Sequence, residues 1–517
     1  MPSFLHSPRR WFPAALTVGA LFPLLAGAQA VHPALTQVNP AFLPSGDEIQ
    51  AWHRFKDEGG PTYSGGPAWH RYVSFVEERL KHLGVVGLTR NEWRYDQWTT
   101  SDWPDDSKWT LVSGGAPVKV AHYGGYSGDT GPGGLTAPLV HYDWAAPPAS
   151  IEGKIAVFTT SPHPEPPLSD DYKTWFTIND HEHLADPGTF PPMFTRVPAA
   201  TSVAYDVWWQ VRQVIGINQA VQKGKAAGAV VVFDMPYERV AGLYTFPMPR
   251  LYQAPTLYLD RDAGRQVLAD ARKGASATLT LVAKVKRVTT HQTIAYLPGR
   301  DYGTPRDEQI VLRTHSDGPS ISQDNGPLGV LALVTYFARV PQAERPRTLT
   351  VYLDNRHYIP GGEGAFKSHD WFERHPEARA RIAGLIALEH LGQLEYREDG
   401  AKLVPTGLVE PSFLWTRGDP ALVSAAIEAA KAHRVPRVMV QTVDRPGIRG
   451  GMQGVWYGMG RIASATEWNL PAFSTMGSQG AYWSSTARLD KFDKDHFRAQ
   501  VATMARLTAV LMTRPRQ

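Results

Sequence analysis

The segment from residue 309 to residue 326 constrains the fold of this chain more than any other part of the sequence. Residues 310–312 (Ile-Val-Leu) form a short apolar run of the kind found in buried β-strands. A His-Ser-Asp triplet follows at 315–317, and Asp-Asn-Gly comes after a short loop at 324–326. Imidazole and carboxylate groups at the carboxyl end of a strand commonly hold a metal ion in an open α/β sheet. The alternative is that they are ordinary solvated polar groups of a surface loop.

Within this segment, His315 is the first candidate metal ligand. Asp317 is too close in sequence to bind the same ion easily together with His315, so it suits a supporting role. In that role its carboxylate would accept the other ring N–H of His315 and fix the imidazole tautomer.

Strands and helices are predicted to alternate from about residue 290 to the end of the chain. Apolar runs at 309–313, 347–353 and 382–388 are typical of strands, and a last helix is predicted over about 494–513. This alternation favours an α/β fold with a mostly parallel, doubly wound sheet. Before residue 290, shorter predicted strands and more frequent turns indicate a second, β-rich part.

The composition excludes several classes of protein. The chain has 517 residues, which favours two domains, and it has no cysteine. Disulfides, thiolate metal sites and cysteine nucleophiles are therefore excluded, and His, Asp and Glu must bind any metal. The net charge is only +4 without a basic cluster, so nucleic acid is not an expected partner. No Gly-x-Ser-x-Gly elbow is present, and no Walker motif follows a strand, so neither a serine α/β-hydrolase nor a P-loop protein is expected.

The first 30 residues have the pattern of a signal peptide. Arg9 and Arg10 precede an apolar stretch at 11–25, and Ala-Gln-Ala at 28–30 is a small-x-small cleavage site. The apolar stretch is too short for a comfortable membrane span, and we expect no other span. The mature protein is therefore expected to be periplasmic or secreted, by either the general or the twin-arginine route.

Several motifs stand in an informative order along the chain. Tyr-Ser-Gly-Gly at 63–66 precedes a predicted helix over 69–83, and Glu-Gly-Lys-Ile-Ala-Val stands at 152–157. Gly-Ala-Val-Val follows at 228–231, and Leu-Asp-Lys-Phe-Asp at 489–493 precedes the last predicted helix. Together these motifs resemble the M28 family of zinc exopeptidases with an inserted protease-associated (PA) domain.

The resemblance implies an organisation for most of the mature chain. The implied fold is α/β, with a mostly parallel doubly wound sheet and an inserted β-rich PA-type domain. After the signal peptide (1–30), the N-terminal part of the M28-like domain would cover 31–130 and the PA-type insertion 131–290. The M28-like catalytic domain would then continue over 291–517.

Metal ligands also follow from the resemblance, because members of this family usually hold two zinc ions. By position, His315 matches the first ligand, Asp317 its orienting carboxylate, and Asp324 the bridging carboxylate. Glu389 matches a later carboxylate ligand, and the adjacent His390 is a further candidate ligand.

Two elements of the family pattern are altered in this chain. His357 and Tyr358 stand where the family has a Glu-Glu pair that supplies the general base and a ligand, and Glu363 lies five residues beyond Tyr358. The last histidine ligand is replaced by Trp483, which follows Tyr482, and an indole N–H cannot bind zinc. We therefore predict one zinc ion rather than two, or none.

These altered positions receive new predicted roles. His357 or Glu363 is the candidate general base, and a histidine has an unperturbed pKa suited to that task. Trp483, Tyr482 and Tyr358 are expected to line the substrate pocket, with Trp483 stacked on a substrate ring.

Three functions remain open at this point. The favoured one is an exported metal-dependent hydrolase that acts, like an aminopeptidase, on peptide or amide bonds of a small peptide. The second is a hydrolase or lyase acting on an oligosaccharide, with His357, Glu363 or Glu389 as acid and base. The third is a binding protein without turnover. The sequence does not determine the oligomeric state.

Overall fold

The computed structural model of this protein describes residues 31–162, 176–178, 184–185, 199–244, 254–360, 370–417, 419–442, 470–477 and 484–516. The signal-peptide segment 1–30 and three predicted site residues, Glu363, Tyr482 and Trp483, lie outside these described residues.

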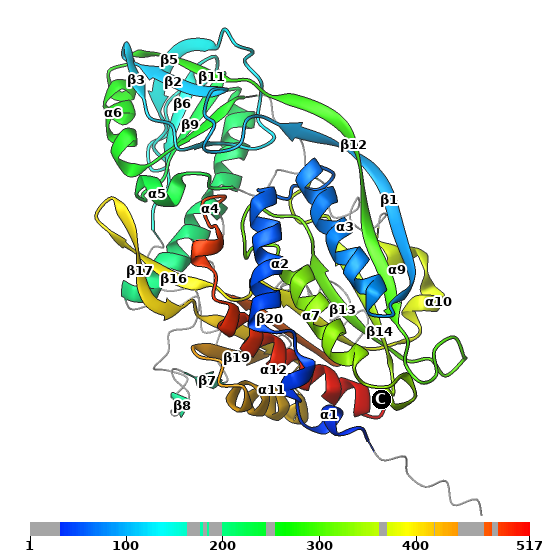
Figure 1. The fold of residues 1–517 in the computed structure, drawn as a ribbon. Coiled ribbons are helices and arrows are strands. Elements are labelled where there is room, and N and C mark those ends of the chain that lie inside the picture. The colour runs from blue at the N-terminus through cyan, green and yellow to red at the C-terminus, as the bar shows by residue number, and fades with distance from the viewer. Residues whose placement is uncertain are drawn as a thin grey trace, which may run out of the picture. The chain divides into compact units, whose positions relative to one another are not determined.

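A ten-stranded sheet contains the strands predicted in the second half of the chain (Figure 1). The strand order across it is β1-β12-β14-β13-β15-β20-β18-β19-β7-β8. In chain order these strands are β1 (Val86–Thr99), β7 (Phe176–Ile178), β8 (Leu184–Ala185), β12 (Lys284–Leu297), β13 (Gln309–His315), β14 (Thr348–Asp354), β15 (Ile382–Glu389), β18 (Ser412–Thr416), β19 (Val438–Thr442) and β20 (Ala472–Gly477).

The sheet is parallel at its centre and mixed as a whole. β14, β13, β15 and β20 run parallel, whereas β1, β12 and β14 pair antiparallel. β1 leaves the sheet at Thr99 and β12 returns directly opposite at Lys284, so the two long strands must run in opposite directions. The parallel arrangement predicted from the sequence therefore describes the central strands and the pair β18 and β19, and not the sheet as a whole.

Burial on both faces explains why the central strands are continuous apolar runs. In β13, Ile310 and Leu312 belong to the hydrophobic core on one face, and Val311 belongs to the core on the other. In β14, Val351 and Tyr352 divide between the same two cores. A strand that is covered on both faces has apolar side chains on both, so apolar and polar residues do not alternate along it.

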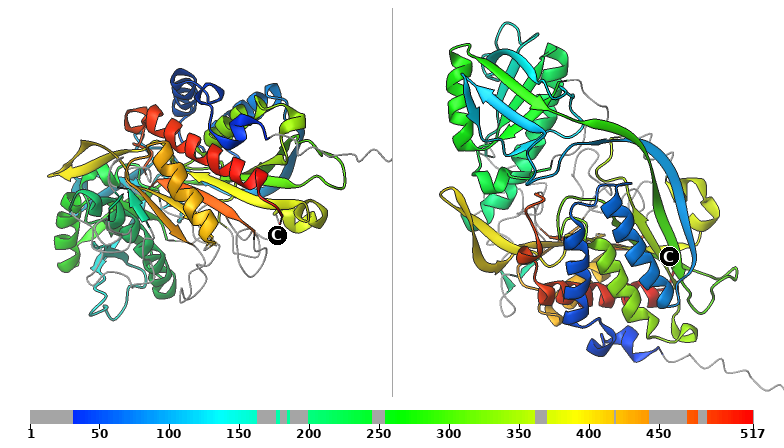
Figure 2. Two further views of the ribbon diagram at one scale, coloured as in Figure 1. Left: turned by 90° about the horizontal axis from the view of Figure 1, so that it is seen from below. Right: turned by 45° about the horizontal axis from the view of Figure 1, so that its top comes forward.

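Long helices cover one face of this sheet. α2 (Gly46–Gly59), α3 (Pro67–His82) and α7 (Gly326–Ala338) pack against one another, and α12 (Lys494–Thr513) contacts α7 and β15 (Figure 2). α11 (Pro420–Ala432) packs on α12. The shorter helices are α1 (Pro33–Thr36), η1 (Pro40–Phe42), η3 (Gln342–Glu344), α9 (Trp371–Arg374), α10 (Pro376–Arg379) and η6 (Leu489–Lys491).

A second sheet of eight strands is built from residues between 109 and 281. Its order is β3-β2-β11-β5-β6-β9-β10-β4, and β5, β6, β9 and β10 run parallel. The strands are β2 (Trp109–Ser113), β3 (Ala116–Val118), β4 (His122–Tyr123), β5 (Leu135–His141), β6 (Ile155–Thr159), β9 (Gly228–Val232), β10 (Thr256–Leu259) and β11 (Ser276–Leu281). The accompanying helices are α4 (Ala199–Gly224), α5 (Tyr237–Val240) and α6 (Arg261–Arg272).

A two-stranded hairpin of β16 (Leu394–Asp399) and β17 (Lys402–Val409) completes the described structure. Within the described part of the chain, no helix combines the length and the apolar character that a membrane crossing requires.

Candidate metal centre

Three of the predicted ligands meet at the carboxyl edge of the ten-stranded sheet. His315 ends β13 and Glu389 ends β15, and these strands are adjacent and parallel. With His390, they form a buried group whose candidate ligand atoms all lie within 4.8 Å of one another. The Nε2 atoms of both histidines lie 3.9 Å from Oε2 of Glu389. The structure thus brings together two imidazoles and one carboxylate that the sequence had proposed as ligands.

The hydrogen bond at Nδ1 prepares His315 to act as a ligand. Nδ1 lies 2.9 Å from the main-chain oxygen of Asp317, so Nδ1 carries the proton and Nε2 has a lone pair. Nε2 is buried and has no hydrogen-bond partner among the described residues. A buried polar atom without a partner is costly, and a bound metal ion would satisfy it.

The role predicted for Asp317 is filled by a different part of that residue. Its main-chain carbonyl, and not its carboxylate, accepts the ring N–H of His315. The carboxylate instead accepts the main-chain N–H groups of His357, at 3.2 Å, and Tyr358, at 2.8 Å. Burial raises the pKa of Asp317 to about 8, although these two hydrogen bonds oppose the shift. Asp317 therefore joins the loop after β13 to the loop after β14.

Burial controls the charge of the centre. It raises the pKa of the Glu389 carboxyl to about 8, with Arg313 opposing the shift. It also lowers the pKa of His315 to about 3, and the pKa values of His357 and His390 well below the usual range. The imidazoles are thus neutral and able to donate lone pairs, and the carboxylate lacks sufficient compensating charge. A divalent cation would supply that charge.

The backbone of His390 adopts an unusual conformation at this centre. Its φ is 53°, in the left-handed region that non-glycine residues rarely occupy. The N–H of Gly477 donates to the His390 carbonyl at 3.0 Å, and a Cβ at Gly477 would collide with that oxygen. Close packing from β20 therefore holds His390 in a conformation that costs on the order of 1–3 kcal/mol.

The residues present fit a zinc ion. Two imidazole nitrogens and a carboxylate oxygen form a common donor set for catalytic zinc, which keeps a further position open. The unpartnered Nε2 of His315 and the uncompensated carboxyl of Glu389 both favour a bound cation.

Asp324, the predicted bridging ligand, does not belong to this group. Its Oδ1 lies 2.7 Å from Nζ of Lys56, and its Oδ2 accepts a hydrogen bond from the hydroxyl of Thr62. Burial raises the pKa of Asp324 to about 6, and Lys56 opposes that shift. An ammonium group thus stands at the carboxylate where the sequence predicted a metal ion.

His357 lies directly beside the centre, whereas Tyr358 turns into the protein interior. The rings of His357 and His315 stack with centroids 4.1 Å apart and planes 20° apart, and His357 is half-buried. Tyr358 is only 2% exposed and packs edge-on against Tyr244, with centroids 4.7 Å apart. The structure therefore gives Tyr358 a packing role rather than the predicted place on a pocket wall.

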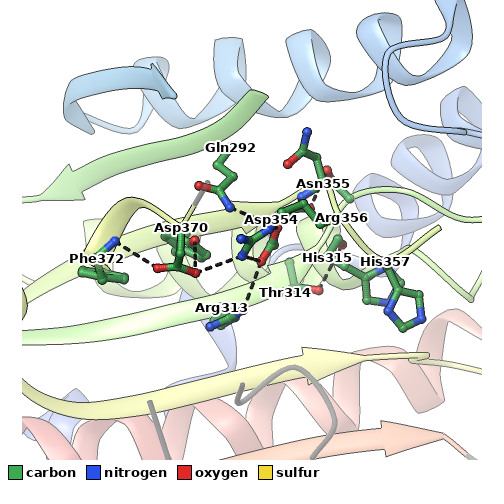
Figure 3. Close-up of polar contacts among 12 residues, drawn as sticks. Gln292, Arg313, Thr314, His315, Asp354, Asn355, Arg356, His357, Asp370 and Phe372 are labelled. Atoms are coloured by element: carbon green, nitrogen blue, oxygen red, sulfur yellow. Dashed lines mark hydrogen bonds and ion pairs between the residues drawn. The ribbon is translucent and has the colours of Figure 1, made fainter. Parts of the chain in front are cut away.

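A network of buried charges supports the centre from the end of β14 (Figure 3). Asp354 pairs with Arg313 at 3.0 Å and with Arg356 at 2.5 Å, and Arg356 also pairs with Asp370 at 2.9 Å. Nε2 of Gln292 donates to Asp354 at 3.3 Å. Burial alone would raise the pKa of Asp354, but the two arginines hold it well below its usual range. The network keeps the Asp354 carboxylate ionised and fixes the backbone that follows β14, where the Asn355 N–H donates to the same carboxylate.

Lys56 and the charge network were not predicted from the sequence, although weak signals exist for both. Lys56 stands at helical spacing from Ile49 and Trp52, on the face of α2 that is buried. Arg313 interrupts an otherwise apolar strand, and Asp354 ends another. A charged residue on a face that must be buried indicates a buried partner, but these signals do not identify the partner.

Comparisons with known proteins identify the fold. No family model and no curated protein matches this chain. A peptidase M28 precursor from Shewanella amazonensis SB2B matches with 16% identity and a TM-score of 0.57, over 91% of this chain and 97% of that one. BSAP, a zinc aminopeptidase from Bacillus subtilis, matches with 11% identity and a TM-score of 0.55, over 90% and 95%. An aminopeptidase from Aneurinibacillus sp. strain AM-1 matches with 14% identity and a TM-score of 0.52, over 92% and 95%.

At these identities the likeness concerns the fold, and it extends over nearly the full length of both chains in each pair. The chain has the fold of the M28 peptidases.

Proposed function

We propose that this protein is an exported zinc-dependent hydrolase that cleaves peptide or amide bonds in the manner of an aminopeptidase. The observation that carries the proposal is the buried group of His315, Glu389 and His390 with an unpartnered imidazole nitrogen. Two further observations support it. Solved structures of the same fold include one protein named as a zinc aminopeptidase and another named as an aminopeptidase, and residues 1–30 have the pattern of an export signal.

Each residue near the centre has a defined task in this proposal. His315, Glu389 and His390 would hold the zinc ion, which when bound supplies Lewis acidity for hydrolysis. His357 is the candidate acceptor of the proton from the attacking water because its ring stacks on that of His315 with centroids 4.1 Å apart. Burial and the neighbouring His315 lower its pKa, which keeps the ring neutral and also weakens it as a base. The main-chain N–H of His357 donates a hydrogen bond to the Asp317 carboxylate, which holds His357 in place.

The proposed substrate is a small peptide with a free amino terminus. The first test uses the protein without residues 1–30, purified without chelator, and combines elemental analysis with a panel of aminoacyl p-nitroanilides and dipeptides. We expect bound zinc and turnover of at least one substrate. Glu389→Gln should lose the metal and reduce kcat/KM by about 100-fold or more, because a ligand is lost.

Glu308→Gln is the matched control, because Glu308 precedes β13 at the opposite end from His315 and pairs with Arg347 at 2.6 Å. This variant should keep its zinc and its activity. Absence of zinc from the wild-type protein, or zinc without turnover of any aminoacyl or peptide substrate, would contradict the proposal. In the second case an oligosaccharide panel would follow.

A further inference from the structure

Lys56 and Asp324 form a buried ion pair at the edge of the metal centre. Their side chains are 2% and 0% exposed, and Nζ of Lys56 lies 2.7 Å from Oδ1 of Asp324. The same Nζ donates to the main-chain oxygen of Ser320 at 2.5 Å. Thr62 donates its hydroxyl to the other carboxylate oxygen, and the Tyr72 hydroxyl donates to the Asp324 carbonyl at 3.0 Å. The protein alone therefore places a positive charge at one oxygen of this carboxylate and a hydrogen-bond donor at the other.

The energetics of such a pair explain why it excludes a metal ion. A charge buried alone is very unfavourable, and removal of one partner from a buried pair is strongly destabilising. A lysine ammonium is a compact positive charge with three donors, so at a carboxylate it occupies the position that a cation would take. While Lys56 remains there, its ammonium group neutralises the negative charge at Asp324 Oδ1 that would otherwise attract a metal ion.

Lys56 also lies close enough to the centre to influence a second ion. Its partner Asp324 is followed by Asn325, which exchanges hydrogen bonds with the main chain of Leu391, the residue after His390. A dication bound between Asp324 and the imidazoles would therefore face like-charge repulsion, which is strong in a poorly solvated site.

We propose that Lys56 is a built-in cation that neutralises Asp324 and limits the centre to one divalent ion held by His315, Glu389 and His390. This inference rests on the proposed function, because it takes that three-residue group to bind zinc. It assigns Lys56 a role in determining the metal content of the site.

The test is a count of zinc ions per chain. The metal is removed from the protein by chelation, excess zinc is added, free zinc is removed by gel filtration, and bound zinc is measured by elemental analysis. We expect one ion in the wild-type protein and one in Asp324→Asn, because Asp324 is not a ligand. Lys56→Ala removes the ammonium and exposes two oxygens, Asp324 Oδ1 and Ser320 O. It should bind a second ion, and the double variant Lys56→Ala/Asp324→Asn should return to one.

Two controls separate the role of Lys56 from a general effect of breaking a buried pair. Lys56→Arg keeps the positive charge and should bind one ion. Arg437→Ala breaks another buried pair, in which Arg437 lies 2.9 Å from Glu395, and should also bind one ion. Circular dichroism checks that each variant is folded. If Lys56→Ala does not fold, the zinc content of Asp324→Asn still decides, since loss of its ion would overturn the inference.

The outcomes distinguish the two proposals. Two ions in the wild-type protein, loss of the ion in Asp324→Asn, or only one ion in folded Lys56→Ala would overturn the inference on Lys56 and leave the zinc hydrolase standing. No ion in the wild-type protein would overturn both.

Discussion

Glu389 and Asp354 end the two strands that flank β13, yet their surroundings affect the two carboxylates in opposite ways. Burial raises the pKa of Glu389 to about 8. The pKa of Asp354 stays well below its usual range because Arg313 and Arg356 pair with it. At the residue scale, a carboxyl group with little compensating charge thus lies one strand away from a carboxylate that pairs with two arginines, and this difference favours Glu389 over Asp354 as the candidate metal ligand.

Glu77 on α3 provides a test of the same principle away from the centre. It is 1% exposed and accepts hydrogen bonds from Arg90 at 2.5 Å and Thr293 at 2.7 Å, and it lies 3.2 Å from the His291 ring. Burial alone would raise its pKa, but these partners lower it to about 2. A depressed carboxyl pKa adds stability above the unfolded value, and that stability is lost as the pH falls toward the folded value.

We therefore predict that Glu77→Gln lowers the free energy of unfolding by roughly 2 kcal/mol near pH 7, after allowance for the partly exposed Arg90. The difference from wild type should shrink as the pH falls from about 4.5 toward 2. Urea unfolding near pH 7 and near pH 3, followed by tryptophan fluorescence, measures both values. A difference that stays constant with pH would contradict the assigned pKa shift.

At the scale of elements, the amino end of α7 lies unusually close to the strands that carry the ligands. Gly326 is its first residue, and a Cβ there would collide with the Thr314 side chain and the main-chain oxygen of Leu388. Asn325 exchanges hydrogen bonds with the main chain of Leu391, at 2.8 and 3.0 Å. The helix start is thus fitted between β13 and the segment that follows β15.

Gly326→Ala should consequently destabilise the protein by roughly 1–3 kcal/mol, because main-chain and packed atoms cannot yield without moving the strands. Zinc affinity should also fall, since Thr314 and Leu388 are the neighbours of His315 and Glu389. Gly133→Ala is the control: a Cβ there meets nothing within 4 Å, so both stability and affinity should stay unchanged. Thermal unfolding measures the stability and zinc titration the affinity. Unchanged values in Gly326→Ala would contradict the prediction, because they would show that Thr314 and Leu388 move aside at little cost.

The strands that are most buried were the easiest to predict from the sequence. Strands buried on both faces, such as β13 and β15, have continuous apolar runs that identify them in the sequence. The helix α2 was not predicted, because its buried face includes His53 and Lys56, which interrupt the apolar stripe. For the same reason the partner of Asp324 was not found: the pair joins residues far apart in the chain, and only the fold brings them together.

The candidate site was predictable to the extent that strand ends determine it. His315 was predicted from the end of its strand pattern, and Glu389 was predicted through the family resemblance. The structure brings the two together because each ends a strand and the two strands are parallel neighbours. The bridging role of Asp324 was predicted through the family resemblance, and the structure pairs its side chain with Lys56 and leaves it outside the group of His315, Glu389 and His390. The structure does not test the roles predicted for Glu363, Tyr482 and Trp483.

At the scale of the whole molecule, the first described residues are held by the last helix (Figure 1). α1 packs against α12. Arg498 on α12 donates to the carbonyls of Pro44, at 3.1 Å, and Pro40, at 2.8 Å. His53 on α2 stacks on Phe492, just before α12, with centroids 3.7 Å apart. The two ends of the described chain therefore stabilise each other.

Arg498→Ala should loosen residues 33–45 without affecting the metal centre. Loss of two hydrogen bonds from a charged donor is expected to speed amide exchange in that segment by about 10-fold. Lys494→Ala on the same helix is the control: Lys494 pairs at 3.5 Å with Asp47, which is 99% exposed, and such pairs contribute little. Hydrogen exchange with mass spectrometry follows residues 33–45 and β13 together, and equal protection in both variants would contradict this role of Arg498.

The parallel pairing of β13 and β15 has a consequence for how such a protein can change over time. Neighbouring strands keep a separation of about 4.8 Å, whatever side chains they carry. His315 and Glu389 stand at the ends of these two strands, so the hydrogen-bonded pairing of the strands sets the distance between the two residues. Substitutions in the surrounding loops can then change the substrate preference, while the distance between the candidate ligands His315 and Glu389 stays the same.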